Sequence, residues 1–359
     1  MIVASLAVLV SLSMIVVATG FLPRASAGEC KGTPHAPILI QSDKDFTAKN
    51  GVSSGSGTPS DPFRIVNLAI NDMSAGYALK IDNSGGKITK SFIVSCLSDG
   101  WKTPAPGGAY VVWIVGIHTP TTISSVLSNS GELEDSNGIR VESSSNILVD
   151  DASMNKMGGD GVQIVASDHI TIIESKLKAE GDGLLIQDSH HITVGQVCSV
   201  GGGMGCDEFT YDDTHGIAIH NSHDIQVIDT MTSADDSGGI LLDGKGTYNV
   251  VLTGGEATGN GPICRSGVST GIVSDTIAGI AFTNGAHDIT VEDYSVQANG
   301  DGAGGYFDLM NGGNGMYLNP CGGPIVILPT SPPAGGNIVF VNVCYHFEFG
   351  FNVAPPSSC

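Results

Sequence analysis

Two aspartates and a histidine recur at one position of a repeated phrase in the sequence. Asp160, Asp182 and His215 each stand directly before a glycine that opens an apolar strand pattern. If successive phrases stack as strands, residues at equivalent positions lie about 5 Å apart. Carboxylates at that separation either share a cation or raise one another's pKa, as in acid–base catalysis and in calcium sites. Asp-Gly and Asn-Gly steps also supply unusual backbone angles for tight turns, so catalysis and turn formation both remain open for this acidic column.

Histidines gather at a second repeated position, just before the second apolar pair of each phrase. The residue pairs at this position are Ser145/Asn146, Asp168/His169, His190/His191, His223/Asp224 and His287/Asp288. Stacked phrases would place His169 on His191 and His190 on His223, and imidazole is a ligand that suits copper or zinc. No compact ligand spacing such as CxxC or HxxxH accompanies them, so histidine could also simply replace asparagine in a stacked turn.

An acidic segment separates the third phrase from the fourth and reads MGCDEFTYDDTH from 204 to 215. Its carboxylates, with two from the following period, are candidate calcium ligands, and its aromatic rings could stack on a sugar. The candidate cation ligands are Asp207, Glu208, Asp235 and Asp236, and the candidate substrate contacts are Phe209, Tyr211, Asp212 and Asp213. The ordered ligand spacing of an EF-hand is missing, and a solvated acidic loop needs no function.

The elements that position these residues repeat with a period near 22. Glycines 138, 161 and 183 are 23 and 22 residues apart, and the phrase returns at 216, 239 and 279. After each glycine come two pairs of apolar residues in which the members alternate with outward residues, and a weaker third pair is visible in three of the periods. Each pair marks one face of a short strand, and a fixed period in the twenties marks a solenoid. The sequence therefore predicts an all-β fold, a right-handed parallel β-helix with three-strand coils and terminal caps.

The predicted organisation has four parts. Residues 1–27 are an apolar signal peptide, 28–64 an amino-terminal cap, 65–320 the parallel β-helix and 321–359 a carboxy-terminal cap. Extra residues in two periods predict loops at about 198–214 and 254–278.

Composition limits the class of partner. A formal charge of −21 disfavours nucleic acid and unaided binding of anionic polymers, but it suits cations and neutral glycans. The signal segment predicts a secreted or cell-surface protein, with membrane attachment only through an uncleaved anchor. Eight cysteines in such a protein predict disulfides, and Cys198 with Cys206 is the favoured pair.

Residues 37–70 carry a resemblance to a known group of proteins. The runs PILIQSDKDF and NGVSSGSGTPSDPFRIVNLAI are similar to the lead-in segment of secreted archaeal and bacterial right-handed parallel β-helix proteins, the pectate-lyase-like group that includes the NosD-like family. The resemblance implies the fold, and it implies copper handling as one activity among several, because this fold hosts unrelated functions.

The acidic column also resembles the polygalacturonase site. Asp160, Asp182 and His215-Gly216 match members of that site, which would make them catalytic. Gly181 stands where that family places its general acid, and no Arg-X-Lys follows near Gly239. Without an acid, the leaving oxygen has no proton donor, so a lyase or epimerase is favoured over such a hydrolase.

Four functions remain open. The leading hypothesis is a secreted protein that binds an extracellular polysaccharide or a cell-surface component, with calcium as a cofactor. The alternatives are a polysaccharide-modifying enzyme on the same flank, a NosD-like periplasmic protein that holds copper or zinc through His169, His190, His191 and His223, and a structural surface protein.

Overall fold

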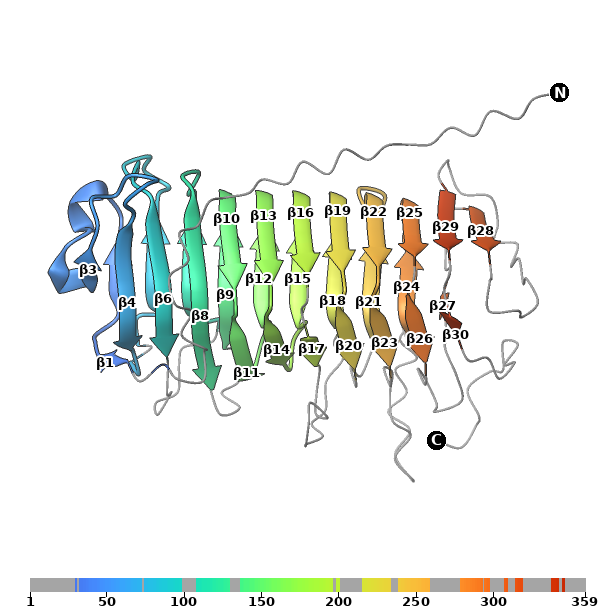
Figure 1. Cartoon of the computed structure of the whole chain (residues 1–359), viewed down its shortest axis with the longest axis horizontal. Helices are drawn as coiled ribbons and strands as arrows, with labels where there is room; N and C mark the ends of the chain where they lie inside the picture. The colour runs from blue at the N-terminus through green and yellow to red at the C-terminus, as the bar shows by residue number, and fades with distance from the viewer. Residues whose placement is uncertain are drawn as a thin grey trace.

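A computed structural model shows one row of β-strand coils stacked along the long axis of the molecule (Figure 1). The structure describes Cys30 and residues 32–72, 74–98, 108–129, 136–195, 198–200, 215–233, 238–258, 278–292, 294–297, 307–308, 314–318, 337–341 and 344–345. The predicted signal segment lies outside these residues. Within the described part of the chain, no helix has the length and apolar character needed to cross a membrane.

The first face of the coils is a ten-stranded parallel sheet. Its strands are β2 (Ile38–Ile40), β5 (Tyr77–Asp82), β7 (Tyr110–Val115), β9 (Asn137–Glu142), β12 (Val162–Val165), β15 (Leu184–Gln187), β18 (His215–His220), β21 (Gly238–Asp243), β24 (Ala278–Thr283) and β27 (Phe307–Asp308). Each strand pairs in parallel with the strand one coil away, so residues at equivalent positions of successive phrases form columns.

The second and third faces belong to one continuous set of paired strands, because β8 (Thr121–Asn129) pairs with both β10 and β11. The second face contains β10 (Ser145–Asp150), β13 (Asp168–Ile173), β16 (His190–Gly195), β19 (His223–Ile228), β22 (Tyr248–Thr253), β25 (His287–Glu292) and β29 (Asn337–Val341). The third face contains β11 (Ser153–Met157), β14 (Lys176–Ala179), β17 (Cys198–Val200), β20 (Met231–Ser233), β23 (Glu256–Thr258), β26 (Ser295–Gln297) and β30 (Cys344–Tyr345). Three strands per coil were predicted, and from β9 to β26 the structure confirms them.

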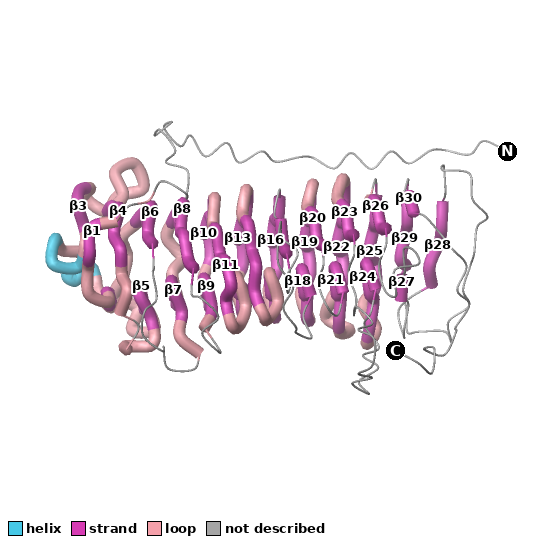
Figure 2. The backbone as a smooth tube through the Cα atoms, turned by 90° about the horizontal axis from the view of Figure 1, so that it is seen from below, coloured by secondary structure: helices cyan, strands magenta, loops and turns pink. Residues whose placement is uncertain are grey.

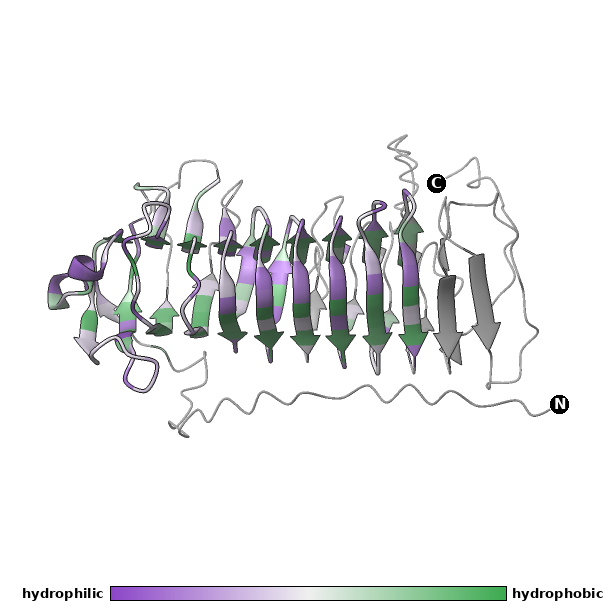
Figure 3. Ribbon diagram, turned by 90° about the horizontal axis from the view of Figure 1, so that it is seen from above, coloured by the Kyte–Doolittle hydropathy of each residue, from purple (hydrophilic) through white to green (hydrophobic). Residues whose placement is uncertain are grey.

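Columns of aliphatic side chains fill the interior of the coils. The alternating pairs predicted from the sequence, such as Ile139/Val141 and Val162/Ile164, are fully buried. Apolar and polar bands therefore run across neighbouring strands (Figure 3). Burial of each such side chain contributes about 1.5–3 kcal/mol, and stacking makes the buried columns one continuous core.

A buried column of hydroxyl groups forms the turn between the first and second faces. Its members are Ser144, Ser167, Ser189, Ser222 and Thr247. The Ser189 hydroxyl accepts a hydrogen bond from the Ser167 backbone N–H at 3.0 Å and donates one to the Gln187 carbonyl at 2.8 Å. Because each coil repeats this pattern, the turn and the residues after it are held in register.

Two residues after each of these hydroxyl residues, the backbone is left-handed. The residues and their φ angles are Asn146 (61°), His169 (51°), His191 (52°), Asp224 (56°) and Asn249 (53°), and Asp288 (52°) stands at the same place after the buried Ala286. Asn, Asp and His are the non-glycine residues that enter this region most readily. The residue at this position, such as His169 or His191, must therefore adopt a left-handed backbone, and histidine is one of the residues that can do so.

The two ends of the coil stack extend further than the sequence predicted. At the amino end, β2 already belongs to the first face, and the cap consists of the 3₁₀ turns η2 (Asp43–Asp45) and η3 (Ala48–Asn50) with β3 (Val52–Ser54). Strands β1 (Thr33–Pro34), β4 (Phe63–Ala69) and β6 (Phe92–Ser98) precede β8. Figure 2 shows this cap at one end of the row, where β3 pairs antiparallel with β4.

At the other end, β29 and β30 pair in parallel with β25 and β26, so coil strands continue into the segment predicted as a cap. The additional strand β28 (Asn314–Leu318) pairs with β29. The predicted loop boundaries also shift, because β17 begins at 198 and β23 occupies 256–258. In the two coils with a predicted loop, the third strand, β17 or β23, comes before the long insertion and pairs with its neighbours on both sides.

Candidate functional site

The structure brings the acidic column together at the start of the first face. The Asp160 carboxylate accepts a hydrogen bond from the Asp182 backbone N–H at 2.8 Å, and the Asp182 carboxylate accepts one from the His215 N–H at 3.1 Å. The Asn137 side-chain oxygen accepts a hydrogen bond from the Asp160 backbone N–H at 2.9 Å. Each side chain therefore fixes the backbone of the next coil. This observation supports a structural role for the column, but a different one from the predicted turn angles, because the glycines after Asn137 and Asp160 are not left-handed.

Those glycines are required by close approach of neighbouring coils. A Cβ atom at Gly138 would lie 2.1 Å from the Gly161 carbonyl oxygen, and one at Gly161 would lie 2.6 Å from the Gly183 carbonyl oxygen. A Cβ at Gly181 would lie 2.3 Å from Asp160 Oδ1. The position where a polygalacturonase carries its general acid thus has no space for a side chain while Asp160 keeps this hydrogen bond.

The pKa of Asp160, in the middle of this column, is displaced from its usual value. Burial raises the pKa of Asp160 to about 6, and the adjacent Asp182 carboxylate adds to the increase. Hydrogen bonds from the Asp182 backbone and the Gln163 side chain act in the opposite direction. His215 approaches Asp182 with Nδ1 at 3.3 Å, while its Nε2 is buried with no hydrogen-bond partner among the described residues. The raised pKa allows Asp160 to exchange a proton near neutral pH.

A column of outward side chains leads from Asp160 across the first face. The strand register aligns Lys80, Trp113, Arg140 and Gln163 on β5, β7, β9 and β12. The Lys80 ammonium lies 3.7 Å from the centre of the Trp113 ring, and the Tyr110 and Trp113 ring centres are 5.1 Å apart. We call Lys80, Tyr110, Trp113, Arg140 and Gln163 the outer column.

Hydrogen bonds connect the outer column to the acidic column. Arg140 Nη1 donates to Gln163 Oε1 at 2.5 Å, and Gln163 Nε2 donates to Asp160 Oδ2 at 2.7 Å. The Tyr110 hydroxyl lies 3.5 Å from Gln163 Oε1. Arg140 Nε also pairs with Glu142 at 2.9 Å, so its charge is balanced on the surface. A partly exposed aromatic pair and a fixed polar network therefore share one surface.

The histidine positions of the second face stack as predicted. The rings of His169 and His191 are 4.7 Å apart at 29°, and those of His190 and His223 are 5.2 Å apart at 22°. The stack continues through Tyr248 to His287, with centre distances of 4.6 and 5.5 Å. We call the aligned residues Asp168, His190, His223, Tyr248 and His287 the histidine column.

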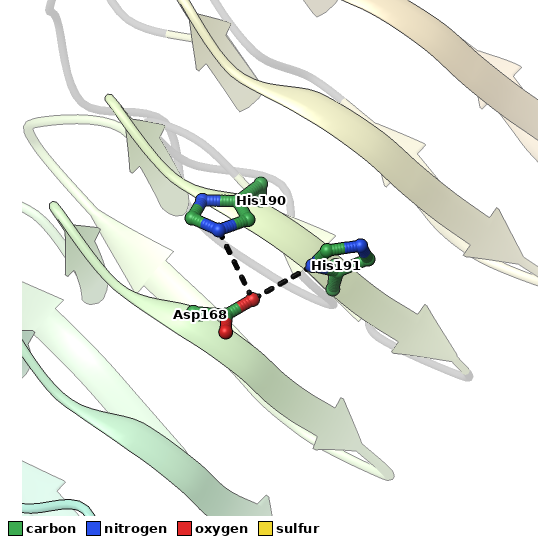
Figure 4. Close-up of side chains that lie close together, drawn as sticks. All are labelled: Asp168, His190 and His191. Carbon is green, nitrogen blue, oxygen red and sulfur yellow. Dashed lines mark hydrogen bonds and ion pairs between the residues drawn. The ribbon is translucent and has the colours of Figure 1, made fainter.

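Asp168 gathers three of these imidazoles around its carboxylate, and Figure 4 shows two of them, His190 and His191. Its Oδ1 lies 2.8 Å from His191 Nδ1 and 3.3 Å from His190 Nε2, and its Oδ2 lies 2.7 Å from His169 Nδ1. Burial opposes ionisation of Asp168, but the hydrogen bonds from His191 and His169 outweigh it and hold the pKa of this carboxyl below its usual value. Within the described residues, Asp168, His190 and His191 can offer ligand atoms within 4.8 Å of one another.

Several predicted site residues cannot be placed. Asp207, Glu208, Phe209, Tyr211, Asp212, Asp213, Asp235 and Asp236 lie outside the described residues. The favoured Cys198–Cys206 pairing also falls there, since Cys206 is not described. Among the described residues, the structure shows a disulfide between Cys30 and Cys96.

The sequence alone did not identify two groups of residues that the structure adds to the candidate sites. Tyr248 completes the histidine column, but its coil carries an insertion before the second strand, which obscured the alignment. Trp113, Tyr110 and Gln163 belong to the outer column, and the alternation in YVVWIV and DGVQIV is the signal that directs Trp113 and Gln163 away from the aliphatic core, although neighbouring side chains bury Gln163.

Comparison with known proteins finds a family match over the coil region of the chain. The family described as right handed beta helix region matches residues 110–296, more than half of the chain. A search of the curated proteins finds no match. Among solved structures, pectate lyase Pel9A is similar with a TM-score of 0.44 and 12% identity, covering 89% of this chain and 80% of that one. The A-module of the Azotobacter vinelandii mannuronan C-5 epimerase AlgE6 gives a TM-score of 0.24 and 11% identity over 78% of this chain and 74% of that one. The family match, together with the stacked parallel strands, shows that this protein belongs to the right-handed β-helix family.

Proposed function

We propose that the protein binds an extracellular polysaccharide along the outer column of the first face. The observation that carries the proposal is the alignment of Lys80, Trp113, Arg140 and Gln163 on four successive coils, with Tyr110 packed beside Trp113. Four coils span about 14 Å at the ordinary strand spacing. This surface is long enough to contact several units of an extended chain.

The side chains of the outer column match what a sugar chain presents. A sugar ring has an apolar face that packs on aromatic rings, and hydroxyl groups that need both donors and acceptors. Trp113 and Tyr110 supply the rings, while Arg140 supplies a polar group that the buried Gln163 holds in place. Because Gln163 also holds the Asp160 carboxyl, these groups keep their positions before a ligand arrives, which lowers the entropy cost of binding.

The charge of this surface favours a neutral or weakly charged glycan. Lys80 pairs with Asp82 at 3.2 Å and Arg140 pairs with Glu142, so neither cation is available to a polyanion without breaking an ion pair. The net charge of −21 adds a general repulsion of anionic chains. Binding of a uronic polysaccharide would therefore require a cation, which is the role proposed for calcium.

The binding proposal is tested with a panel of soluble neutral and uronic polysaccharides, by affinity electrophoresis and calorimetry, with and without Ca²⁺. Trp113→Ala and Tyr110→Ala are each expected to weaken binding of the recognised glycan by about tenfold or more, because the stacking surface is lost. Tyr248→Ala is the matched control, since Tyr248 is an outward aromatic residue on the second face. Equal losses in all three variants, or no binding by the wild-type protein, would contradict the proposal.

A second candidate function is modification of the bound chain, with Asp160 as the proton-exchanging group. The observation in its favour is the pKa of Asp160, raised to about 6, together with the hydrogen bond that joins Asp160 to the outer column. A general acid or base works best with a pKa near the working pH. Turnover of a bound glycan that disappears in Asp160→Asn while glycan binding persists would support this role, and unchanged turnover in that variant would exclude it.

A further inference from the structure

Three ligand atoms converge on the outside of the second face, at the start of strands β13 and β16 (Figure 4). Asp168 Oδ1 lies 2.8 Å from His191 Nδ1 and 3.3 Å from His190 Nε2. Ligands placed about 2.1 Å from a tetrahedral zinc ion lie about 3.4 Å from one another. We propose that Asp168, His190 and His191 form a binding site for a divalent transition-metal ion, with Zn²⁺ as the reference ion.

The left-handed backbone makes this ligand set possible. In an ordinary strand, successive side chains point to opposite faces, so His190 and His191 would diverge. His191 has a φ of 52°, and the burial pattern of β16 shows both histidines outside and Ile192 as the first buried residue. The strand register then places Asp168 of the preceding coil directly opposite His190.

Neighbouring side chains hold the three ligands in position. His169 Nδ1 lies 2.7 Å from Asp168 Oδ2, the carboxylate oxygen that faces away from the other two imidazoles. The ring of His169 also stacks on His191, and the ring of His223 stacks on His190. Ligand carboxylates and imidazoles in metal sites are commonly oriented by such outer contacts.

Asp224 provides a further outer contact, for His191. Its Oδ2 lies 3.8 Å from His191 Nε2 and 2.9 Å from His223 Nδ1, and its other oxygen accepts a hydrogen bond from Asn249. If His191 binds the ion through Nδ1, its remaining N–H is on Nε2 and faces this carboxylate. A carboxylate behind a metal-bound imidazole fixes the tautomer and strengthens the ligand.

The chemistry of the ligand set selects the ion. Two imidazole nitrogens and one carboxylate oxygen suit zinc, nickel or copper, whereas calcium prefers six to eight oxygen ligands. A metal-bound imidazole nitrogen offers its lone pair, so the nitrogens of His190 and His191 that face Asp168 would bind the ion, and each neutral ring would keep its N–H on the other nitrogen. With three protein ligands, a fourth position is left for water or an external ligand.

The site is tested by calorimetric titration of Zn²⁺ into the chelator-treated, full-length protein, with Ca²⁺ as the contrasting ion. We expect a tight site near one equivalent for Zn²⁺, undisturbed by an equal concentration of Ca²⁺. The variant His190→Ser/His191→Asn repeats the Ser145-Asn146 pair of an earlier coil, so it keeps a residue suited to the left-handed backbone. It is expected to weaken Zn²⁺ binding by more than about 100-fold, and His169→Asn by about 10–100-fold.

The control variant is His287→Ser, at the far end of the histidine column. His287 pairs with Asp288 at 2.9 Å, and the two belong to no three-ligand group among the described residues. This variant should retain the tight site. Equal Zn²⁺ affinity in the wild-type protein and in His190→Ser/His191→Asn, displacement of Zn²⁺ by equimolar Ca²⁺, or no Zn²⁺ binding at all would each overturn the proposal. Glycan binding is measured separately, because its residues lie on the first face.

Discussion

At the scale of single residues, Asp160 shows how one side chain serves both the fold and a site. Its Oδ1 fixes the Asp182 backbone, and its Oδ2 holds Gln163 of the outer column. The same burial that makes these contacts raises the pKa of Asp160 to about 6. Protonation of Asp160 therefore favours the folded state, and this contribution is full below about pH 4 and is lost as the pH rises through 6.

Replacement of Asp160 by asparagine should remove this dependence. Asn137 occupies the equivalent position one coil earlier and accepts the same backbone hydrogen bond, so the substitution fits the column. Between about pH 4 and pH 7, the free energy of unfolding of the wild-type protein should fall by about 2–3 kcal/mol relative to Asp160→Asn. Urea unfolding at a series of pH values measures the difference. Parallel pH profiles for the two proteins would mean that Asp160 is not perturbed by its surroundings.

At the scale of elements, the hydroxyl column sets the geometry of the histidine column that follows it. Ser167 and Ser189 immediately precede Asp168 and His190. Each hydroxyl links the turn of one coil to the turn of the next. The left-handed residue that follows keeps two successive side chains on the outside. The position of the proposed metal site is thus a consequence of turn structure.

Loss of one hydroxyl in this column should be costly. Ser189→Ala leaves the buried Ser167 N–H and the Gln187 carbonyl each without a hydrogen bond that they make now. We expect the free energy of unfolding to decrease by about 1–3 kcal/mol. Ser189→Thr is the matched control, because Thr247 fills the same position two coils later, and it should remain near wild-type stability. Equal stability of the alanine and threonine variants in urea unfolding would show that the column contributes little.

At the scale of the whole molecule, a coil contacts only its neighbours, so the ends of the stack need protection. The amino-terminal cap covers the first coil, and the Cys30–Cys96 disulfide joins the chain before β1 to strand β6. The link closes a long loop, with a sequence separation of 66 residues. It should stabilise the end of the stack by restricting the unfolded chain.

Removal of the Cys30–Cys96 disulfide should destabilise the amino-terminal end of the stack. Cys30→Ser/Cys96→Ser should lower the free energy of unfolding by about 2–5 kcal/mol. Thermal unfolding monitored by circular dichroism measures the loss, and peptide mapping of the wild-type protein should identify the linked pair. A different partner for Cys96 in the peptide map would contradict the structure at this end.

The sequence by itself determined the architecture. The period near 22, the alternating pairs such as Ile139/Val141 and the absence of helix signals were sufficient, because each strand has one apolar face that only stacking can bury. The stacking of His169 on His191 and of His190 on His223 also followed, since register turns sequence alignment into proximity. These features depend on local pattern and on a constant strand spacing.

The tertiary structure decided which columns can act as sites. The sequence could not show that Gly181 has no room for an acid, that Tyr248 joins the histidine column across an insertion, or that Gln163 links Asp160 to Tyr110 and Arg140. These features depend on side-chain orientation across coils and on the left-handed φ at His191, which the residue types allow but do not dictate. The reason is that burial, pKa and ligand geometry arise from contacts between coils, whereas the sequence pattern describes each coil alone.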